Sequence, residues 1–235
     1  MKDAFLHKHT SSGFKHDSLP VATPLRVDRR IFIAAGASAL AVIASLILAW
    51  YTAHRKLEGK FYGQAIVPPM EAFDFHLVDQ DDKPFQLSQL RGRIVLFDFG
   101  FTHCPNVCPT TLSDLAKVYQ ALPVEDRGKV QILFVSVDPR RDRPQVLKGY
   151  MPYFDTSFVG LTGSDDQVAE TAKAYGAFYE TVRNPGDSPD VYSVNHSTYT
   201  YLITADGKWK LLYDFDQLRD TEKMVTDIER VLTGS

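Results

Sequence analysis

Cysteine is scarce in this sequence, and its scarcity limits what the chain can be. Only two cysteines occur among 235 residues, Cys104 and Cys108. A chain of this length buries a sizeable core without disulfide staples, so the pair is not needed to hold a small scaffold together. Two thiols are also too few for an iron–sulfur cluster with four cysteine ligands. The pair therefore indicates either a redox couple or part of a site for a soft metal ion.

An excess of charge of one sign is absent as well. The chain has 26 Lys and Arg against 29 Asp and Glu, a formal net charge of −3, and the two signs are interspersed. A basic face of the kind that binds nucleic acid is therefore not expected. Internal repeats and a sustained heptad pattern are also missing, which argues against solenoid and coiled-coil folds.

Charged residues are missing from one long segment, Ile31–Trp50. At about 1.5 Å per residue this segment spans roughly 30 Å, the thickness of a bilayer core. A cleaved signal peptide is the alternative, but its apolar region is about 7–15 residues long and precedes a small-residue cleavage site. The segment is longer and lacks a good site, so we predict a retained transmembrane anchor at 31–50.

The flanks of this segment predict its orientation. Lys and Arg are more frequent in residues 1–30 than just after the segment, which places the N-terminus inside. Residues 1–30 are polar and are predicted to be a disordered cytoplasmic tail, with 51–70 a linker and 71–235 one domain. The tail lacks an Arg- and Ser-rich amphipathic pattern. We therefore expect a bacterial inner membrane with a periplasmic domain, rather than a mitochondrial inner membrane facing the intermembrane space.

The region after the linker alternates apolar strands with amphipathic helices. Helices between buried strands predict an α/β fold, and a Cys motif at the first strand-to-helix junction narrows this to a thioredoxin-like fold with an added hairpin. The Asp-Gly turn at Asp206 predicts the last hairpin. We expect strands at 73–78, 84–87, 93–99, 130–137, 158–161, 177–182, 198–203 and 208–215, a helical turn at 88–90, helices at 111–122, 144–150, 165–175 and 221–232, and an exposed loop at 184–190.

The spacing of the thiols favours metal binding without settling it. Cβ atoms four residues apart on a helix are about 5–6 Å apart, whereas an unstrained disulfide needs about 3.8 Å. Two thiolates on one metal ion, each at about 2.3 Å, fit the wider spacing better. Pro105 and Pro109 favour a preset turn over a continuous helix, and a turn could still close a disulfide. The partial positive charge of a helix N-terminus would stabilise thiolate in either role.

An imidazole is the expected third ligand, and seven histidines are available. His103 directly precedes Cys104, and its side chain should point away from the thiol. His196 lies in a loop just before the strand at 198–203, where an ordinary loop histidine remains an alternative. His76 fits a half-buried surface position in a strand. The other four lie near the N-terminus: His7, His9 and His16 are in the predicted tail, and His54 is beside the predicted anchor.

Four blocks of the sequence resemble the Sco/SenC family, membrane-anchored copper proteins that help to assemble cytochrome c oxidase. They are FTHCPNVCPTTL at 101–112, VSVDPRRDRP at 135–144, VNHS at 194–197 and YLITADG at 201–207. The blocks follow the family order and cover essentially the whole region after the anchor. The resemblance rests on the four blocks together and not on the cysteine pair alone.

This resemblance implies a specific site and function. It implies that Cys104, Cys108 and His196 bind one copper ion, Cu(I) or Cu(II), and that copper or reducing equivalents go to the dinuclear copper site of oxidase subunit II. An upstream copper donor or thiol reductant would be a further partner. The family commonly has Asp before this histidine, where this chain has Asn195, so tuning by a carboxylate there is in doubt. Asp138 and Asp142 match a family motif, although capping of the helix at Pro144 is an equal alternative.

The sequence therefore predicts a copper metallochaperone, a transfer protein rather than an enzyme. The alternative is a thiol-disulfide oxidoreductase that keeps the oxidase cysteines reduced through a disulfide between Cys104 and Cys108. Two intervening residues are typical of such enzymes, and this chain has three. A thiol peroxidase is a third, weaker alternative. Copper binding and thiol exchange could coexist, because oxidation of the pair would disable the copper site.

Overall fold

The computed structural model describes residues 40–50, 52, 61–186, 188 and 191–234. The chain forms two units, 1–49 and 50–235. Residues 40–50 are helical and exposed. Across these described ranges, no helix is both long and apolar enough to cross a membrane. The predicted tail, the first part of the predicted anchor and residues 53–60 of the predicted linker lie outside the described residues.

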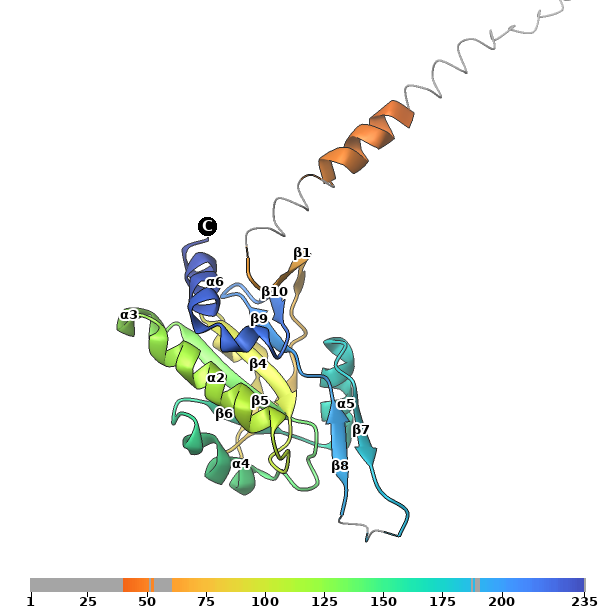
Figure 1. The fold of residues 1–235 in the computed structure, drawn as a ribbon, viewed down its shortest axis with the longest axis vertical. Helices are drawn as coiled ribbons and strands as arrows, with labels where there is room; N and C mark the ends of the chain where they lie inside the picture. The colour runs from red at the N-terminus through yellow and green to blue at the C-terminus, as the bar shows by residue number, and fades with distance from the viewer. Residues whose placement is uncertain (1–39, 51, 53–60, 187, 189–190, 235) are drawn as a thin grey trace, which may run out of the picture. The chain divides into compact units, whose positions relative to one another are not determined.

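The larger unit is built on an eight-stranded mixed sheet (Figure 1). Its strand order is β1-β10-β9-β4-β5-β6-β2-β3, and β7 and β8 form a separate two-stranded sheet. The strands of the main sheet are β1 (Gln64–Glu71), β2 (His76–Asp79), β3 (Pro84–Gln86), β4 (Ile94–Gly100), β5 (Val130–Ser136), β6 (Val159–Thr162), β9 (Thr200–Ile203) and β10 (Lys208–Tyr213); the hairpin has β7 (Tyr179–Val182) and β8 (Ser193–His196).

The centre of the sheet is buried on both faces. Every residue of β4 is buried, and β4 pairs in parallel with β5 and antiparallel with β9. A continuous apolar run is what a strand covered on both faces requires, so the predicted strand at 93–99 is confirmed. Because β4 is central, whatever follows its last residue is held by the best-packed part of the fold.

Helices cover both faces of this sheet. Helix α2 (Val107–Ala121) packs beside α6 (Thr221–Thr233) on one face (Figure 1). On the other face an aromatic cluster joins Tyr175, at the end of α5 (Asp165–Ala174), to Phe97 of β4 and Tyr201 of β9. The remaining helices are α3 (Val124–Arg127), α4 (Pro144–Tyr150) and the short 3-10 helices η1 (Leu87–Leu90), η2 (Met151–Tyr153) and η3 (Gln217–Arg219).

Local sequence explains several boundaries. α4 starts with Pro144, where the missing N–H costs nothing because that group has no partner within the helix. α5 is preceded by Ser164, which forms a capping box with Gln167. The β9–β10 turn contains Gly207 with a positive φ of 79°, as the Asp-Gly pattern predicts. The predicted helices at 144–150, 165–175 and 221–232 and the final hairpin are confirmed.

The N-terminal boundary of the domain differs from the prediction. The linker was expected to reach residue 70, but Gln64–Glu71 form β1 at the edge of the main sheet. The backbone N–H groups of Tyr62 and Gly63 donate to the carboxylate of Asp227 in α6, at 3.0 and 2.8 Å. The prolines that suggested a linker are tolerated because an edge strand leaves one side of its backbone unpaired.

Two further differences concern the predicted site. α2 begins at Val107, so Cys108 and Pro109 are in its first turn, where the N–H that proline lacks is not needed. His196 was expected in a loop but is the last residue of β8, which pairs with β7. The exposed loop predicted at 184–190 lies between these two strands, and residues 187, 189 and 190 of it are outside the described part.

Candidate metal centre

The two cysteines lie where the central strand leads into α2. β4 ends at Gly100, and the loop after it carries Cys104, whose backbone N–H donates to the Phe101 carbonyl at 3.1 Å. Cys108 is 1% exposed, whereas Cys104 is half-buried. A Cβ on Gly100 would lie 2.9 Å from the Cys108 sulfur and 2.6 Å from the Phe134 ring. Glycine is therefore needed for β4 to pass this closely behind the thiol.

The two thiols are free and electrostatically unlike. The Cys108 thiol and the backbone N–H of Cys108, at 3.4 Å from the Cys104 sulfur, stabilise a thiolate on Cys104 and lower its pKa to about 4. The pKa of Cys108 is raised, because its thiol is the partner of that thiolate and because it is buried. The half-buried thiol is thus the one that ionises first, and thiolate is the form that binds metals and attacks disulfides.

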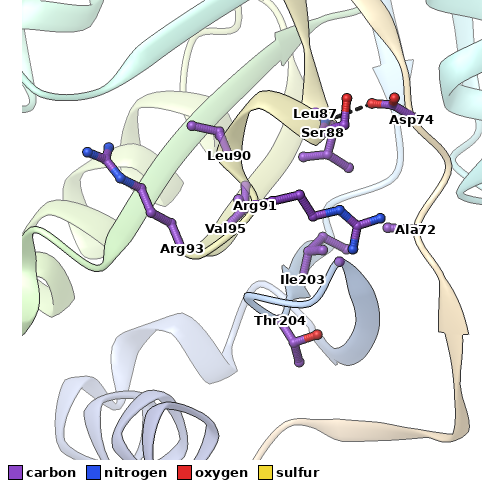
Figure 2. A pocket seen from close by; sticks show the side chains of 11 residues that line it. Ala72, Asp74, Leu87, Ser88, Leu90, Arg91, Arg93, Val95, Ile203 and Thr204 are labelled. Atoms are coloured by element: carbon purple, nitrogen blue, oxygen red, sulfur yellow. Dashed lines mark hydrogen bonds between the residues drawn. The ribbon is translucent and has the colours of Figure 1, made fainter.

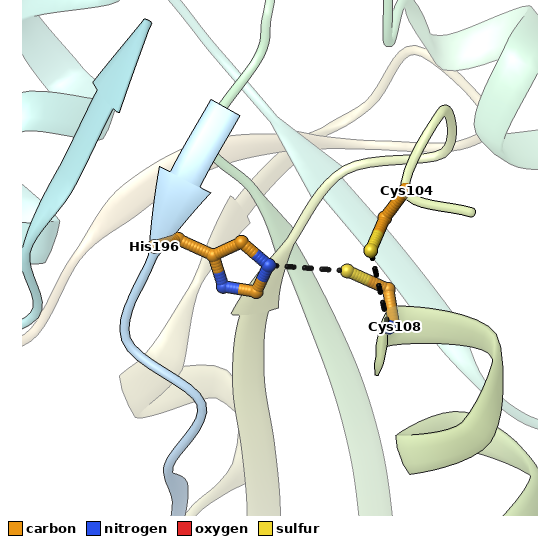
Figure 3. Close-up of side chains that lie close together, drawn as sticks. All are labelled: Cys104, Cys108 and His196. Atoms are coloured by element: carbon orange, nitrogen blue, oxygen red, sulfur yellow. Dashed lines mark hydrogen bonds between the residues drawn. The ribbon is translucent and has the colours of Figure 1, made fainter. Parts of the chain in front are cut away.

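His196 brings an imidazole to this pair from a distant part of the chain (Figure 3). Its Nε2 atom lies 3.3 Å from the Cys108 sulfur. Its Nδ1 atom lies 2.8 Å from the carbonyl oxygen of Ser197, which assigns the ring proton to Nδ1. Nε2 then faces the thiols with a free electron pair. A backbone carbonyl on the other nitrogen fixes the tautomer in the way that metal-binding histidines require.

The candidate ligand atoms of Cys104, Cys108 and His196 all lie within 4.8 Å of one another. No other group of three His, Cys, Asp or Glu side chains in the described part of the chain comes together in this way. Two sulfur atoms and one imidazole nitrogen form a soft donor set that suits copper or zinc. The structure thus brings together the three residues that the family resemblance selects, while their role as ligands stays a prediction.

The other histidines do not join this cluster. His103 is exposed, and its Nδ1 atom lies 3.1 Å from the Thr102 hydroxyl; the backbone at residues 102 and 103 is a turn and not the extended segment that was expected. His76 is in β2 and pairs with Gln86 at 2.8 Å. His7, His9, His16 and His54 lie outside the described residues.

Asp138 and Asp142 do not cap α4, which was the alternative to a role at the site. The N-cap of α4 is Arg143, without a side-chain hydrogen bond. Asp142 instead accepts hydrogen bonds from the backbone N–H of Thr102 at 2.8 Å and from Ser136 Oγ at 2.7 Å, and burial raises its pKa. Asp142 thereby holds the first residues of the cysteine loop to the end of β5.

Asn195 lies on the outer side of the hairpin. It is exposed and pairs with Glu180 of β7. Neighbouring residues of a strand point to opposite faces, so its side chain is directed away from the face that carries His196. The second nitrogen of His196 is already bonded to the Ser197 carbonyl. A carboxylate at position 195 is therefore not needed to orient the imidazole.

Asp98 is a buried acidic residue in the central strand, and no role was predicted for it from the sequence. It is 4% exposed in the middle of β4, and burial raises its pKa to about 8. Its Oδ1 atom has no hydrogen-bond partner among the described residues. Its charge would raise the pKa of both Cys108 and Tyr150. Its position as the one acidic residue in an otherwise apolar strand was the feature of the sequence that could have indicated an unusual carboxyl group.

A separate small cavity lies between β4, β9 and the η1 segment (Figure 2). Its volume is about 20 Å³, room for about one water molecule. Arg91 enters the space beside Gly207, where any Cβ would clash with the guanidinium. The cavity contains none of the three candidate ligands and is too small for an organic substrate.

Comparison with known proteins identifies the family. The family model described as SCO1/SenC matches residues 65–233. An SCO2-like protein of Rickettsia felis is 40% identical over 138 residues, which are 58% of this chain and 65% of that protein. The match thus spans just under two thirds of that relative's length. Because the family model covers well over half of the sequence, the chain belongs to the SCO1/SenC family.

Solved structures agree with this fold. Apo Sco1 of Thermus thermophilus is 40% identical with a TM-score of 0.67, covering 73% of this chain and 96% of that one. ScoI of Bradyrhizobium japonicum with copper bound is 31% identical with a TM-score of 0.61, covering 69% and 99%. A further structure, 26% identical with a TM-score of 0.55, is of BsSco, described as having a disulfide switch and belonging to the Sco family of cytochrome c oxidase assembly proteins. The predicted thioredoxin-like α/β fold is confirmed.

Proposed function

We propose that this chain is a copper metallochaperone that binds one copper ion through Cys104, Cys108 and His196. The observation that carries the proposal is the convergence of two sulfur atoms and one imidazole nitrogen within 4.8 Å. Copper is the cargo of this site, and soft thiolates with an imidazole suit it. The copper-bound ScoI structure supports the choice of metal. We propose that the protein has no turnover of a small molecule.

We further propose that the copper goes to the dinuclear copper site of cytochrome c oxidase subunit II. The support is the description of a relative as a member of a family of oxidase assembly proteins. A site with three ligands leaves room for an incoming thiolate, so copper can pass by exchange of ligands without release as a free ion. An upstream copper donor, or a thiol reductant that keeps the pair reduced, would be the second partner.

The proposed location is a membrane surface outside the cytoplasm. The support is the uncharged segment Ile31–Trp50 and the excess of Lys and Arg before it. We propose a single anchor in a bacterial inner membrane with the copper domain in the periplasm. The mitochondrial inner membrane, with the domain facing the intermembrane space, is the alternative. Either setting permits oxidation of the thiols.

A thiol-disulfide exchange role is the second candidate, and the unequal thiols favour it. The thiolate of Cys104 would attack a disulfide of the partner, releasing one partner thiolate and forming a mixed disulfide. Cys108 would then attack the Cys104 sulfur, which releases the second partner thiol and leaves a Cys104–Cys108 disulfide. The partner gains two electrons and this protein loses two. The same oxidation removes both sulfur ligands, so it would also release copper.

Anaerobic titration of the reduced protein with Cu(II), followed by absorption and EPR spectroscopy, tests the leading proposal. Wild type should bind one equivalent with a sulfur-to-copper charge-transfer band and nitrogen hyperfine structure. Cys104→Ser, Cys108→Ser and His196→Ala should each abolish tight binding, whereas His76→Ala is the matched histidine control and should bind like wild type. Full retention of the wild-type affinity by His196→Ala would refute the three-ligand site. Reduction of a protein disulfide at the same rate with and without copper would favour the second candidate.

A further inference from the structure

One arginine contacts both segments that carry the candidate ligands. Arg141 is in the loop between β5 and α4, and its side chain is 18% exposed. Its guanidinium carbon Cζ lies 3.6 Å from the ring centroid of Tyr192, which directly precedes β8. The same atom lies 5.7 Å from the ring centroid of Phe101, which opens the cysteine loop. Arg141 therefore lies between the cysteine loop and the hairpin.

Hydrogen bonds with charged groups fix this arrangement. Arg141 Nη1 donates to the carbonyl oxygen of Tyr192 at 2.9 Å, and Arg141 Nε is ion-paired with Asp138. The Tyr192 hydroxyl closes the set by donating to Asp138 Oδ1 at 2.6 Å. The Asp138 side chain is 3% exposed, so solvent screens these interactions little. Charge-assisted hydrogen bonds of this kind are stronger than neutral ones.

These contacts act on the strand that carries His196. Tyr192, Val194 and His196 alternate along an extended segment, so their side chains share one face. Val194 is 5% exposed, which shows that this face is turned to the protein interior. At the far end of the strand the His196 ring packs edge-on against Phe101, with centroids 5.8 Å apart. Tyr192 contacts Arg141, His196 contacts Phe101, and Arg141 and Phe101 contact each other.

Backbone pairing does not hold this hairpin to the main sheet. β7 and β8 pair with each other and form their own sheet, apart from the eight other strands. The hydrogen bonds between Phe178 and Ser197 also join the two arms of the hairpin to each other. The position of His196 relative to the thiols therefore depends on the short connection to β9 and on side-chain contacts, among which Arg141 provides a charged one to Tyr192.

We propose that Arg141 is a positioning residue for His196. By holding Tyr192 beside Asp138 while it packs on Phe101, Arg141 keeps the hairpin where the imidazole reaches the two thiols. Arg141 does not bind copper itself. The consequence for copper rests on the proposed function, whereas the consequence for the hairpin does not. Removal of Arg141 should therefore weaken copper binding through His196 and leave the thiol pair intact.

The first test compares copper binding in Arg141→Ala, His196→Ala and the double variant. Arg141→Ala should lower the Cu(II) affinity by about 10-fold and reduce the nitrogen hyperfine signal. The double variant should bind no more weakly than His196→Ala alone, because both changes remove the same ligand. Arg143→Ala is the matched control, since it removes the same charge from an exposed position in the same loop. Independent, additive losses in the double variant would overturn the proposal.

The second test needs no copper. Hydrogen exchange in the reduced, metal-free protein should become about tenfold faster for amides of β8 in Arg141→Ala, and remain unchanged for amides of α2. Unchanged protection of β8 would overturn the inference, and equal loss of protection in β8 and α2 would show a general structural role instead. If wild type binds no copper through His196, the proposed function fails, and this exchange experiment still decides the role of Arg141.

Discussion

Cys104 and Cys108 follow the central strand of the main sheet, whereas His196 lies on a hairpin outside it. Strand β4 is buried throughout, and Cys108 is packed against it so closely that Gly100 has no room for a side chain. Most residues of β7 are exposed, and β8 is buried only at Val194. One half of the site is thus fixed by the hydrophobic core, and the other by a few polar and aromatic contacts.

The two halves of the site should therefore be sensitive to different kinds of substitution. The cysteine half should respond to changes of packing and to the burial of charge, because its neighbours cannot move. The histidine half should tolerate change on its outer face and respond to loss of the contacts that hold it to the domain. Three predictions test this contrast with substitutions at residues that are not candidate ligands.

The largest effect on stability should come from Asp98, which lies in β4, the strand that leads into the cysteine loop. Its pKa is raised to about 8 in the folded protein, so the folded state keeps a proton that the unfolded chain releases above its usual pKa of 3.8. Stability should therefore fall as pH rises from about 4 to about 8, with a slope of up to about 1.4 kcal/mol per pH unit. Asp98→Asn cannot lose this proton and should remove that slope.

Urea denaturation of the reduced, metal-free protein at pH 5 and pH 7.5 measures this effect. The variant should gain stability relative to wild type by on the order of 3 kcal/mol between these two pH values. The buried Asp142 titrates in both proteins, so the difference between them isolates Asp98. Parallel stability curves for the two proteins would contradict a raised pKa at this position.

The next effect concerns packing behind Cys108. Gly100→Ala places a Cβ 2.6 Å from the buried Phe134 ring and should destabilise the protein by about 1–3 kcal/mol. Gly149→Ala in α4 is the matched control, since a Cβ there meets nothing within 4 Å and alanine favours a helix by about 0.5–1 kcal/mol. Thermal unfolding of both variants checks the pair. A Gly100→Ala protein as stable as wild type would mean that the cysteine half is not tightly packed.

The smallest effect should come from the outer face of the hairpin. Asn195→Asp introduces a carboxylate directly before His196, at an exposed position away from the thiols. We expect the stability to change by less than about 0.5 kcal/mol and the Cu(II) EPR spectrum to match that of wild type. A shifted spectrum would show that position 195 acts on His196, and the contrast between the two halves would weaken.

The two halves also differ in how far the sequence alone predicts them. β4 has a continuous apolar pattern and was predicted within one residue of its bounds, whereas α2, which carries Cys108, was predicted to begin at residue 111 and begins at Val107. β8 has no such pattern in Ser193–His196, so periodicity left His196 in a loop, and only the family resemblance selected it. A contact between residues 88 positions apart leaves no trace in local spacing. The edge strand β1 was missed because its prolines are also typical of linkers.

The unequal depth of the two sulfur atoms leaves the proposed copper site accessible from one side. The Cys108 sulfur is enclosed by β4 and α2, and only Cys104 is reachable from solvent to a useful extent. In the proposed transfer by ligand exchange, an incoming thiolate would approach from the side of Cys104. Under the proposed function, a partner would therefore meet the site from the side of Cys104.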